Sequence, residues 1–423
     1  MLKTVFVFLL VFSVIVVIHE FGHFYFARRA GILVREFAIG MGPKLFAKQG
    51  KDGVMYTIRM LPFGGYVRLA GLGEDEDAVK PGMTVGLTFN GTGEIIQINT
   101  RDQAQSDELP VQVDSVDLRE TMFIQAIPIG QEEVVSYSVN KKARIIEPDG
   151  TSIQVAPIEV TYNSATPWHK MLTNVAGPIN NFILSIIVFM IVGLASAGVA
   201  NQGSYIGQVV EGEPAALAGL QAGDHVVAIN DASVNTWMQL VMAIHEAPNE
   251  TLNLTVKRGN VTETIQVKVA AEIDERTKET IGRIGITPEY KTSIVDRLMF
   301  GFTQTWAVIV QLITVIASMF KHGFNINQFG GPVAIAQATG QVAKSGWQDV
   351  LMFMGMISAN LGVFNLLPIP ALDGGKIVLN TIEAVRGKPI SQEKEGIVTL
   401  IGVAILVAFM IAVTWNDISR LFR

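Results

Sequence analysis

The chain has 423 residues, of which 49% are hydrophobic and only 17% are charged, and its mean hydropathy is +0.37. This composition is typical of a membrane protein rather than of an ordinary soluble chain. The net charge of −6 excludes a general basic surface for nucleic acid, so no nucleic-acid partner is expected. Since the chain has no cysteine, any metal must be bound by His, Asp or Glu.

The first apolar tract begins at residue 4 and continues, after a polar interruption, to residue 27. About 20 residues cross a bilayer, so residues 1–27 are predicted to form a transmembrane helix. Arg28, Arg29 and Arg35 follow the tract and indicate that its C-terminal end lies in the cytosol. A cleaved signal peptide is the alternative, but no small-residue cleavage site ends the tract.

The polar interruption inside this helix is His19-Glu20-Phe21-Gly22-His23. Side chains four residues apart leave one face of a helix about 6 Å apart along its axis, so both imidazoles can bind one tetrahedral Zn²⁺. Glu20 is placed to accept a proton from a water that the zinc activates. Because ionisable residues are rare and functional inside a membrane span, the cluster predicts metal-dependent hydrolysis.

The next regions alternate between polar and apolar. Residues 28–171 are polar, with period-2 apolar patterns, and are predicted to form a cytosolic β-rich region that includes an insertion without an assignable motif. Residues 172–199 are predicted to form a second transmembrane helix. Residues 203–290 again alternate apolar and polar side chains, which predicts an extracytoplasmic β-rich domain.

Two further transmembrane helices are predicted over residues 349–375 and 395–417. A catalytic zinc usually has three protein ligands, and the third candidate is Asp373, which follows the helix-breaking Pro368 and Pro370. An aspartate that only caps the next helix is the alternative.

The candidate third ligand also constrains the topology. To reach the histidines, the helix before Asp373 must run from the outside to the inside. Residues 296–345 are therefore predicted to form an amphipathic segment on the outer interface instead of a span. The predicted fold class is a polytopic α-helical membrane protein with about four transmembrane helices and both termini outside.

These residues resemble the site-2 protease family of intramembrane zinc metalloproteases, of the bacterial RseP type. The resemblance covers most of the chain and includes the motif around His19 and His23, the stretch Gly177-Pro-Ile-Asn-Asn181, and Pro368-Ile-Pro-Ala-Leu-Asp373-Gly-Gly. It implies that His19, His23 and Asp373 bind Zn²⁺ and that Glu20 is the general base.

The resemblance also implies substrate-binding residues. Two asparagines in the third span would hold an unwound substrate by hydrogen bonds, although asparagine also joins helices to one another. Two glycine pairs would belong to a membrane-associated β-structure whose edge strand pairs with the substrate, although a tight turn would equally require glycine. The candidates are Asn360, Asn365, Gly40, Gly42, Gly64 and Gly65.

Residues 206–230 resemble part of a PDZ domain of the bacterial protease type. A single such domain, together with the cytosolic insertion, is similar to the Gram-positive branch of the family. The resemblance implies a domain that binds a peptide or acts as a size filter. It also implies substrates among anti-sigma factors, remnant signal peptides and precursors of peptide pheromones.

The sequence therefore predicts a zinc-dependent endopeptidase of the bacterial plasma membrane that cleaves single-span membrane proteins in regulated intramembrane proteolysis. Its other partner is the lipid bilayer. A membrane zinc transporter or sensor is the alternative, and Glu20 argues against it because transport needs no general base.

Overall fold

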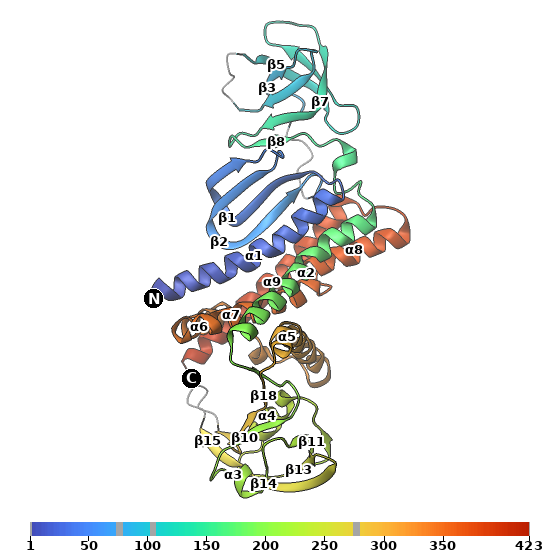
Figure 1. Cartoon of the computed structure of the whole chain (residues 1–423). Coiled ribbons are helices and arrows are strands. Elements are labelled where there is room, and N and C mark those ends of the chain that lie inside the picture. Colours follow the sequence, from blue (N-terminus) through green and yellow to red (C-terminus); the bar gives the residue numbers. More distant parts are fainter. Residues whose placement is uncertain (1, 73–78, 102–106, 274–279, 423) are drawn as a thin grey trace. The chain divides into compact units, whose positions relative to one another are not determined.

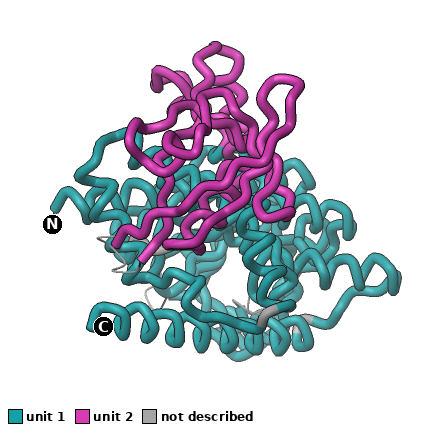
Figure 2. The backbone as a smooth tube through the Cα atoms, turned by 90° about the horizontal axis from the view of Figure 1, so that it is seen from below, with its two compact units in different colours: residues 1–185, 308–423 teal, residues 186–307 magenta. Residues whose placement is uncertain are grey.

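The structure is a computed structural model of residues 1–423 and describes all of them except 1, 73–78, 102–106, 274–279 and 423 (Figure 1). The chain divides into two compact units (Figure 2). Unit 1 comprises residues 1–185 and 308–423, and unit 2 comprises residues 186–307. Helices α2 (Pro167–Ala195) and α5 (Ile294–His322) each contribute residues to both units.

Long apolar helices form the largest part of unit 1. Besides its parts of α2 and α5, its helices are α1 (Leu2–Arg29), η2 (Ile326–Gln328), α6 (Pro332–Ser345), α7 (Trp347–Leu366), α8 (Asp373–Arg386) and α9 (Gln392–Leu421). Among the described residues, α1, α2, α5, α7 and α9 are long and apolar enough to cross a membrane. The sequence predicted about four spans, and α5 is the additional candidate because length and composition alone do not distinguish a span from a surface helix.

The helix predicted over residues 349–375 is broken in the structure. It ends at Leu366, and α8 begins at Asp373 after a short connection that contains Pro368 and Pro370. Ala371 in this connection has a φ of +79°, a conformation that residues other than glycine rarely adopt. The break therefore places the start of a new helix, with Asp373, at the end of an apolar one.

Between α1 and α2 the chain first forms a small sheet from β1 (Val34–Gln49) and β2 (Met55–Leu69). Both strands bend, so that residues 36–39 of β1 pair with residues 55–58 on one side and 65–68 on the other. The sheet thus has four antiparallel segments, and residues 65–69 form one of its edges. Gly40, Gly42 and Gly64 lie at the bends with φ between +76° and +87°, which explains the requirement for glycine there.

A buried ion pair joins three segments of this small sheet. The Glu36 carboxylate, on a side chain only 4% exposed, accepts hydrogen bonds from Arg59 (2.7 Å), Thr57 (2.6 Å) and Tyr66 (3.0 Å). Arg59 also donates a 2.7 Å hydrogen bond to the carbonyl of Gly42 in the bend. Charged hydrogen bonds of this kind fix the edge that contains Tyr66 relative to the rest of the sheet.

The insertion without an assignable motif is a second β-structure. Its strands are β3 (Thr84–Phe89), β4 (Ile95–Asn99), β5 (Leu109–Asp117), β6 (Phe123–Pro128), β7 (Val135–Ile146) and β8 (Ser152–Gln154), in the order β4-β3-β5-β6-β7-β8. A parallel pairing of β4 with β7 closes the first five strands into a barrel around a core that includes Leu87, Ile98 and Ile124. The turn after β7 reaches the small sheet, where Asp149 pairs with Lys44 (2.8 Å). η1 (Ile158–Val160) then leads to α2.

Unit 2 contains the β-rich domain predicted over residues 203–290. Its main sheet has the order β12 (Ala232–Ser233), β11 (His225–Ile229), β13 (Thr251–Arg258) and β14 (Val261–Lys268). The other elements are β9 (Val199–Ala200), β10 (Ile206–Val209), α3 (Pro214–Leu217), α4 (Trp237–His245), β15 (Ala270–Ile273), β16 (Thr280–Arg283), β17 (Ile286–Pro288) and β18 (Tyr290–Lys291). The strands and α4 enclose a core that includes Ile206, Leu240, Leu254 and Ile284.

We predict that the stability of unit 2 depends on the charge of Asp224. This fully buried carboxylate accepts two hydrogen bonds of 2.7 Å from Arg258. Burial by itself raises the pKa of Asp224, but the bonds to Arg258 outweigh it and hold the pKa below its usual value. A lowered pKa adds stability above the unfolded value of about 3.9, and this stability is lost as the pH falls below it.

Scanning calorimetry of the whole protein in detergent between pH 7 and pH 3 measures this effect. We expect Asp224→Asn to lower the stability of unit 2 by about 2 kcal/mol at pH 7 and by less at pH 3, because part of the stabilisation by this charge is already lost once the pH is below the unfolded pKa of about 3.9. Glu211→Gln, at an exposed position of the same unit, is the control and should change neither value. An equal loss for Asp224→Asn at both pH values would contradict the prediction.

Candidate metal centre

The three predicted metal ligands meet at one point of unit 1. His19 and His23 extend from α1, and Asp373 is the first residue of α8. The Nε2 atoms of the two histidines lie 3.2 Å apart, and Asp373 Oδ2 lies 3.3 Å from the first and 3.4 Å from the second. Among the residues that the structure describes, no other group of three His, Asp or Glu side chains is close enough to share a metal ion.

The donor atoms fit a zinc ion. Asp373 Oδ2 is buried and has no hydrogen-bond partner among the described residues, and two imidazole nitrogens face it. Buried polar atoms in proteins normally have a partner, and a divalent cation would supply one to all three ligands at once. Two imidazoles and one carboxylate are also a ligand set that zinc adopts in catalytic sites, where a fourth position stays open.

A backbone carbonyl of helix α2 accepts a hydrogen bond from the ring of His23. His23 Nδ1 lies 2.8 Å from the backbone carbonyl oxygen of Thr173, so the ring donates its Nδ1–H there. The lone pair of Nε2 is then directed toward Asp373. Such a contact fixes both the tautomer and the orientation of a metal-binding imidazole.

Asn181 on the same helix holds His19. Its buried side-chain amide lies 3.1 Å from His19 Nδ1. The amide atom at this distance is Nδ2, and Oδ1 has no hydrogen-bond partner among the described residues; turning the amide over would let Oδ1 accept the Nδ1–H and leave Nε2 free for a metal. Ser358 of α7 donates a 2.8 Å hydrogen bond to the backbone carbonyl of Asn181 and so connects a third helix to this contact.

Glycine allows α1 and α2 to approach closely at the ligands. A Cβ atom on Gly177 would lie 2.4 Å from His23 Nε2 and 2.7 Å from His19 Cε1. A Cβ atom on Gly22 would lie 2.5 Å from the carbonyl oxygen of Ala176. Real Cβ atoms do not make contacts this short, so the backbone of α2 packs directly against both imidazoles.

The first turn of α8 is equally close to the connection that precedes it. A Cβ atom on Gly374 would lie 2.2 Å from the carbonyl oxygen of Leu367, and one on Gly375 would lie 2.4 Å from that of Ile369. The two glycines after Asp373 therefore let α8 begin immediately beside the break. Asp373 is the first helical residue, preceded by the N-cap Leu372, and its side chain is directed to the histidines.

The ligands border a cavity of about 450 Å³. Glu20 lines it beside the histidines, and the edge of the small sheet lines it at Gly64, Gly65 and Tyr66. A Cβ atom on Gly65 would lie 3.3 Å from Cγ of Glu20, so the edge strand passes directly beside the predicted general base. The cavity therefore brings together a metal site, a carboxylate and an edge of a β-sheet.

The predicted substrate-binding residues fall into two groups. Asn365, Gly64 and Gly65 line the cavity. Asn360, Gly40 and Gly42 are not among the residues that line it. The two glycines lie in the bend of β1, where positive φ explains them, and Asn360 lies within α7.

Two residues of this region, Lys376 and Thr173, are not among the site residues predicted from the sequence. Lys376 lines the cavity three residues after Asp373, and helical spacing could have indicated it. Thr173 contributes a backbone carbonyl, which no side-chain pattern reveals.

Comparisons with known proteins agree with this geometry. The family model described as "Peptidase family M50" matches residues 7–409. The chain is 46% identical to "Probable protease eep" of Enterococcus faecalis over 424 residues, covering 100% of both chains. It is 42% identical over 435 residues to a "Putative zinc metalloprotease" of Lactococcus lactis, again covering 100% of both chains.

Solved structures that match part of the chain include a PDZ domain. The PDZ domain of an SdrC-like protein from Listeria monocytogenes is 28% identical, and the match covers 21% of this chain and 90% of that chain. The TM-score of this match is 0.18.

We predict that Gly177→Ala abolishes metal binding. The added methyl group would occupy the space of both imidazoles and displace their Nε2 atoms. Zinc content of the purified protein, measured by mass spectrometry, should fall well below one ion per chain. Gly396→Ala is the matched control, because this helical glycine has open space around it. Full zinc occupancy in Gly177→Ala would contradict the placement of α2 against the histidines.

Proposed function

Since the chain belongs to peptidase family M50 and is therefore a zinc-dependent intramembrane metalloprotease, we propose that it cleaves single-span membrane proteins at the centre formed by His19, His23 and Asp373. The observation that carries this proposal is the convergence of the three donor atoms beside Glu20 in an apolar helix. A transport or sensor site would have no need of the carboxylate at position 20.

The side chains of the site have separate tasks in this reaction. Zinc, when bound, polarises the peptide carbonyl and lowers the pKa of the attacking water. Glu20 takes the proton of that water and delivers it to the leaving amide nitrogen. Thr173 and Asn181 keep both imidazoles oriented, so that the geometry exists before the substrate arrives.

We propose that the substrate binds as an added strand along residues 64–67. In the small sheet the strand segment 65–69 is paired on one side, with residues 34–39, and residues 64–67 line the cavity next to Glu20. An extended peptide can hydrogen-bond to such a free edge. A transmembrane helix must first unwind, because its backbone amides are already bonded within the helix. The Asn365 amide can bond to the unwound backbone from α7.

We propose that four helices cross the membrane and that α5 lies along its outer surface. Arg28 marks the cytosolic end of α1. At the other end of α1, the backbone of Gly340 in α6 approaches Thr4. Asn327, between α5 and α6, accepts a hydrogen bond from Arg420 at the end of α9 (2.6 Å). The chain after α5 therefore lies on the outer side, where residues 203–290 also lie, and both termini are outside.

We propose that unit 2 is a PDZ-type domain that receives a peptide in a cavity of about 350 Å³. The cavity lies between α4 and the start of β17 and is lined by Trp237, Val241 and Ile286. β17 pairs with β10 among the described strands, so a peptide can be added beside it. The apolar lining suits an apolar side chain of the peptide, and Arg283 at its border is paired with Glu272 (2.9 Å) and Glu213 (3.4 Å). The expected substrates in the plasma membrane are anti-sigma factors, remnant signal peptides and pheromone precursors.

We predict that Glu20→Gln lowers cleavage about 10²- to 10⁴-fold, because the amide cannot accept the proton of water. The measurement is cleavage of a tagged single-span protein, already trimmed outside, in membranes that contain the parent or the variant. Zinc content serves as the control and should remain at the parental level, since Glu20 is not a ligand. Cleavage at the parental rate in Glu20→Gln would show that Glu20 is not the general base.

Cysteine labelling tests the proposed topology, because the natural chain has no cysteine. Single substitutions Thr292→Cys and Gln328→Cys flank α5 at exposed positions. We expect both to react with a membrane-impermeant maleimide on intact cells freed of their wall. Glu132→Cys, in the barrel, should react only after lysis. If Gln328→Cys also requires lysis, α5 crosses the membrane and the proposed topology is wrong.

A further inference from the structure

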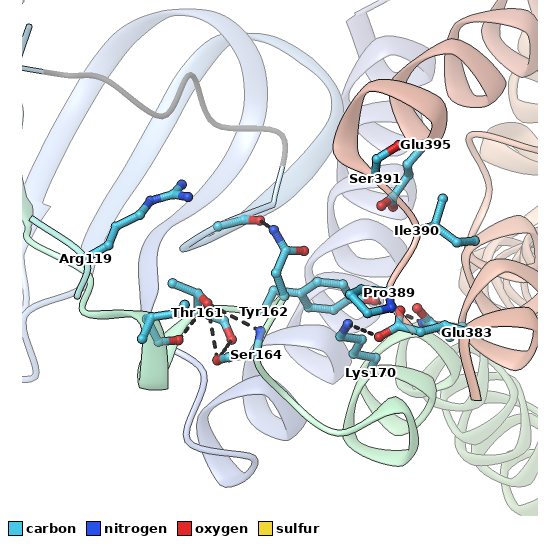
Figure 3. Close-up of a pocket in the computed structure, with 14 residues that line it drawn as sticks. Arg119, Thr161, Tyr162, Ser164, Lys170, Glu383, Pro389, Ile390, Ser391 and Glu395 are labelled. Atoms are coloured by element: carbon cyan, nitrogen blue, oxygen red, sulfur yellow. Dashed lines mark hydrogen bonds and ion pairs between the residues drawn. The ribbon is translucent and has the colours of Figure 1, made fainter. Parts of the chain in front are cut away.

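A second cluster of buried polar side chains lies farther along α8. Lys170 of α2 and Glu383 of α8 form an ion pair of 2.8 Å, with side chains only 3% and 14% exposed. Figure 3 shows the two side chains joined beside Tyr162 at the border of a cavity of about 360 Å³. A lysine this well buried is rare unless it is paired.

Hydrogen bonds to a tyrosine add a second connection between the same two helices. The Tyr162 hydroxyl oxygen accepts hydrogen bonds from Asn174 of α2 (2.8 Å) and from Asn380 of α8 (3.1 Å). The Lys170 ammonium group lies 5.6 Å from the centre of the Tyr162 ring. Burial raises the pKa of Tyr162 to about 12, so the phenol is neutral at physiological pH.

The same stretch of α2 contacts all three metal ligands, directly or through α8. Lys170 and Asn174 reach α8, whereas Thr173 holds His23 and the backbone at Gly177 packs on both imidazoles. Along α8 the ion pair lies ten residues from Asp373, or about 15 Å. A shift or rotation of α8 against α2 would therefore move Asp373 relative to the histidines.

No large apolar side chain of α8 is fully buried, although Ile377 and Leu379 are partly buried. The buried residues of α8 are Gly374, Gly375 and Asn380, and none has a large apolar side chain. The apolar Val378, Ile382 and Val385 are exposed by 41%, 42% and 84%. The ion pair and the tyrosine also border a cavity instead of closely packed side chains. Directional polar contacts therefore help to determine how α8 sits on α2.

We infer that Lys170 and Glu383, together with the Tyr162–Asn380 hydrogen bond, are positioning residues that hold Asp373 at metal-binding distance from His19 and His23. The inference depends on the proposed function for the identity of the metal ligands. A buried ion pair is often no more stabilising than an apolar pair of similar size, so its contribution here is geometry rather than stability. None of these residues contacts the reacting atoms.

The test compares zinc affinity with thermal stability in the full-length protein in detergent. Lys170→Met alone leaves a buried carboxylate without its partner, so both quantities should fall. The double variant Lys170→Met/Glu383→Leu removes both charges and should regain the melting temperature of the parent. Its zinc affinity, measured by competition with a chromophoric chelator, should remain about tenfold to hundredfold weaker than that of the parent.

Two further variants complete the experiment. Lys141→Met removes an exposed ion pair with Glu159 in the cytosolic region and should change neither quantity. Tyr162→Phe keeps the Lys170–Glu383 pair and removes only the hydroxyl, so it decides the question if the double variant does not fold. It should weaken zinc binding about two- to tenfold at nearly unchanged melting temperature.

The outcomes separate this inference from the proposed function. Parental zinc affinity in a folded double variant, or in Tyr162→Phe, would overturn the inference and make the cluster purely structural. If His19→Ala binds zinc as tightly as the parent, the metal centre itself is wrong. Loss of zinc in His19→Ala together with parental affinity in the double variant would leave the proposed function intact and reject only the positioning role.

Discussion

Two imidazoles and a carboxylate cannot be placed inside an apolar helix bundle unless every polar atom has a partner. This requirement accounts for most of the surrounding structure. The backbone of α2 accepts the Nδ1–H of His23, and Asn181 reaches His19. His19 Nε2, His23 Nε2 and Asp373 Oδ2 lie next to one another and have no other polar partner among the described residues. A bound metal ion would supply that partner. This arrangement requires glycine at positions 22 and 177, because a Cβ atom at either position would collide and keep α2 away from α1 and its histidines.

Hydrolysis adds a second condition, since water and an extended peptide must both reach a site within the bundle. The break between α7 and α8 interrupts an apolar helix and brings Asp373 to the cavity. The edge of the small sheet runs beside Glu20, and the buried Glu36–Arg59 pair holds that edge in place. The predicted catalytic residues and the edge proposed to bind substrate thus belong to elements that polar contacts hold in place.

Much of the site could be predicted from the sequence because its chemistry is local. The spacing of His19, Glu20 and His23 within one helix indicates the metal, and the prolines before Asp373 indicate the break. Membership of the protease family, the enzyme class and the need for zinc are confirmed by the comparisons. The role of each site residue stays a prediction until variants are measured.

The remaining features depend on contacts between residues far apart in the chain. Lys170 and Glu383 are 213 residues apart, and neither lies in a recognisable pattern. The closure of the barrel by β4 and β7 and the four segments of the small sheet follow from strand pairing, which alternation of apolar residues does not specify. For α5, length and composition fit both a span and a surface helix, because neither depends on where the helix lies relative to the membrane.

Residues 64–67 form a sheet edge that pairs on one side only among the described strands, and substrate binding there, as proposed, has a consequence for how substrates are distinguished. A strand edge bonds to main-chain groups, which are the same in almost every peptide, so the edge itself reads little of the amino-acid sequence. Discrimination between substrates then depends on how often the transmembrane helix of the substrate unwinds and on how long the unwound segment stays beside the cavity. Two proteins with identical residues around the cleaved bond would be cut at different rates if one helix frays more readily than the other.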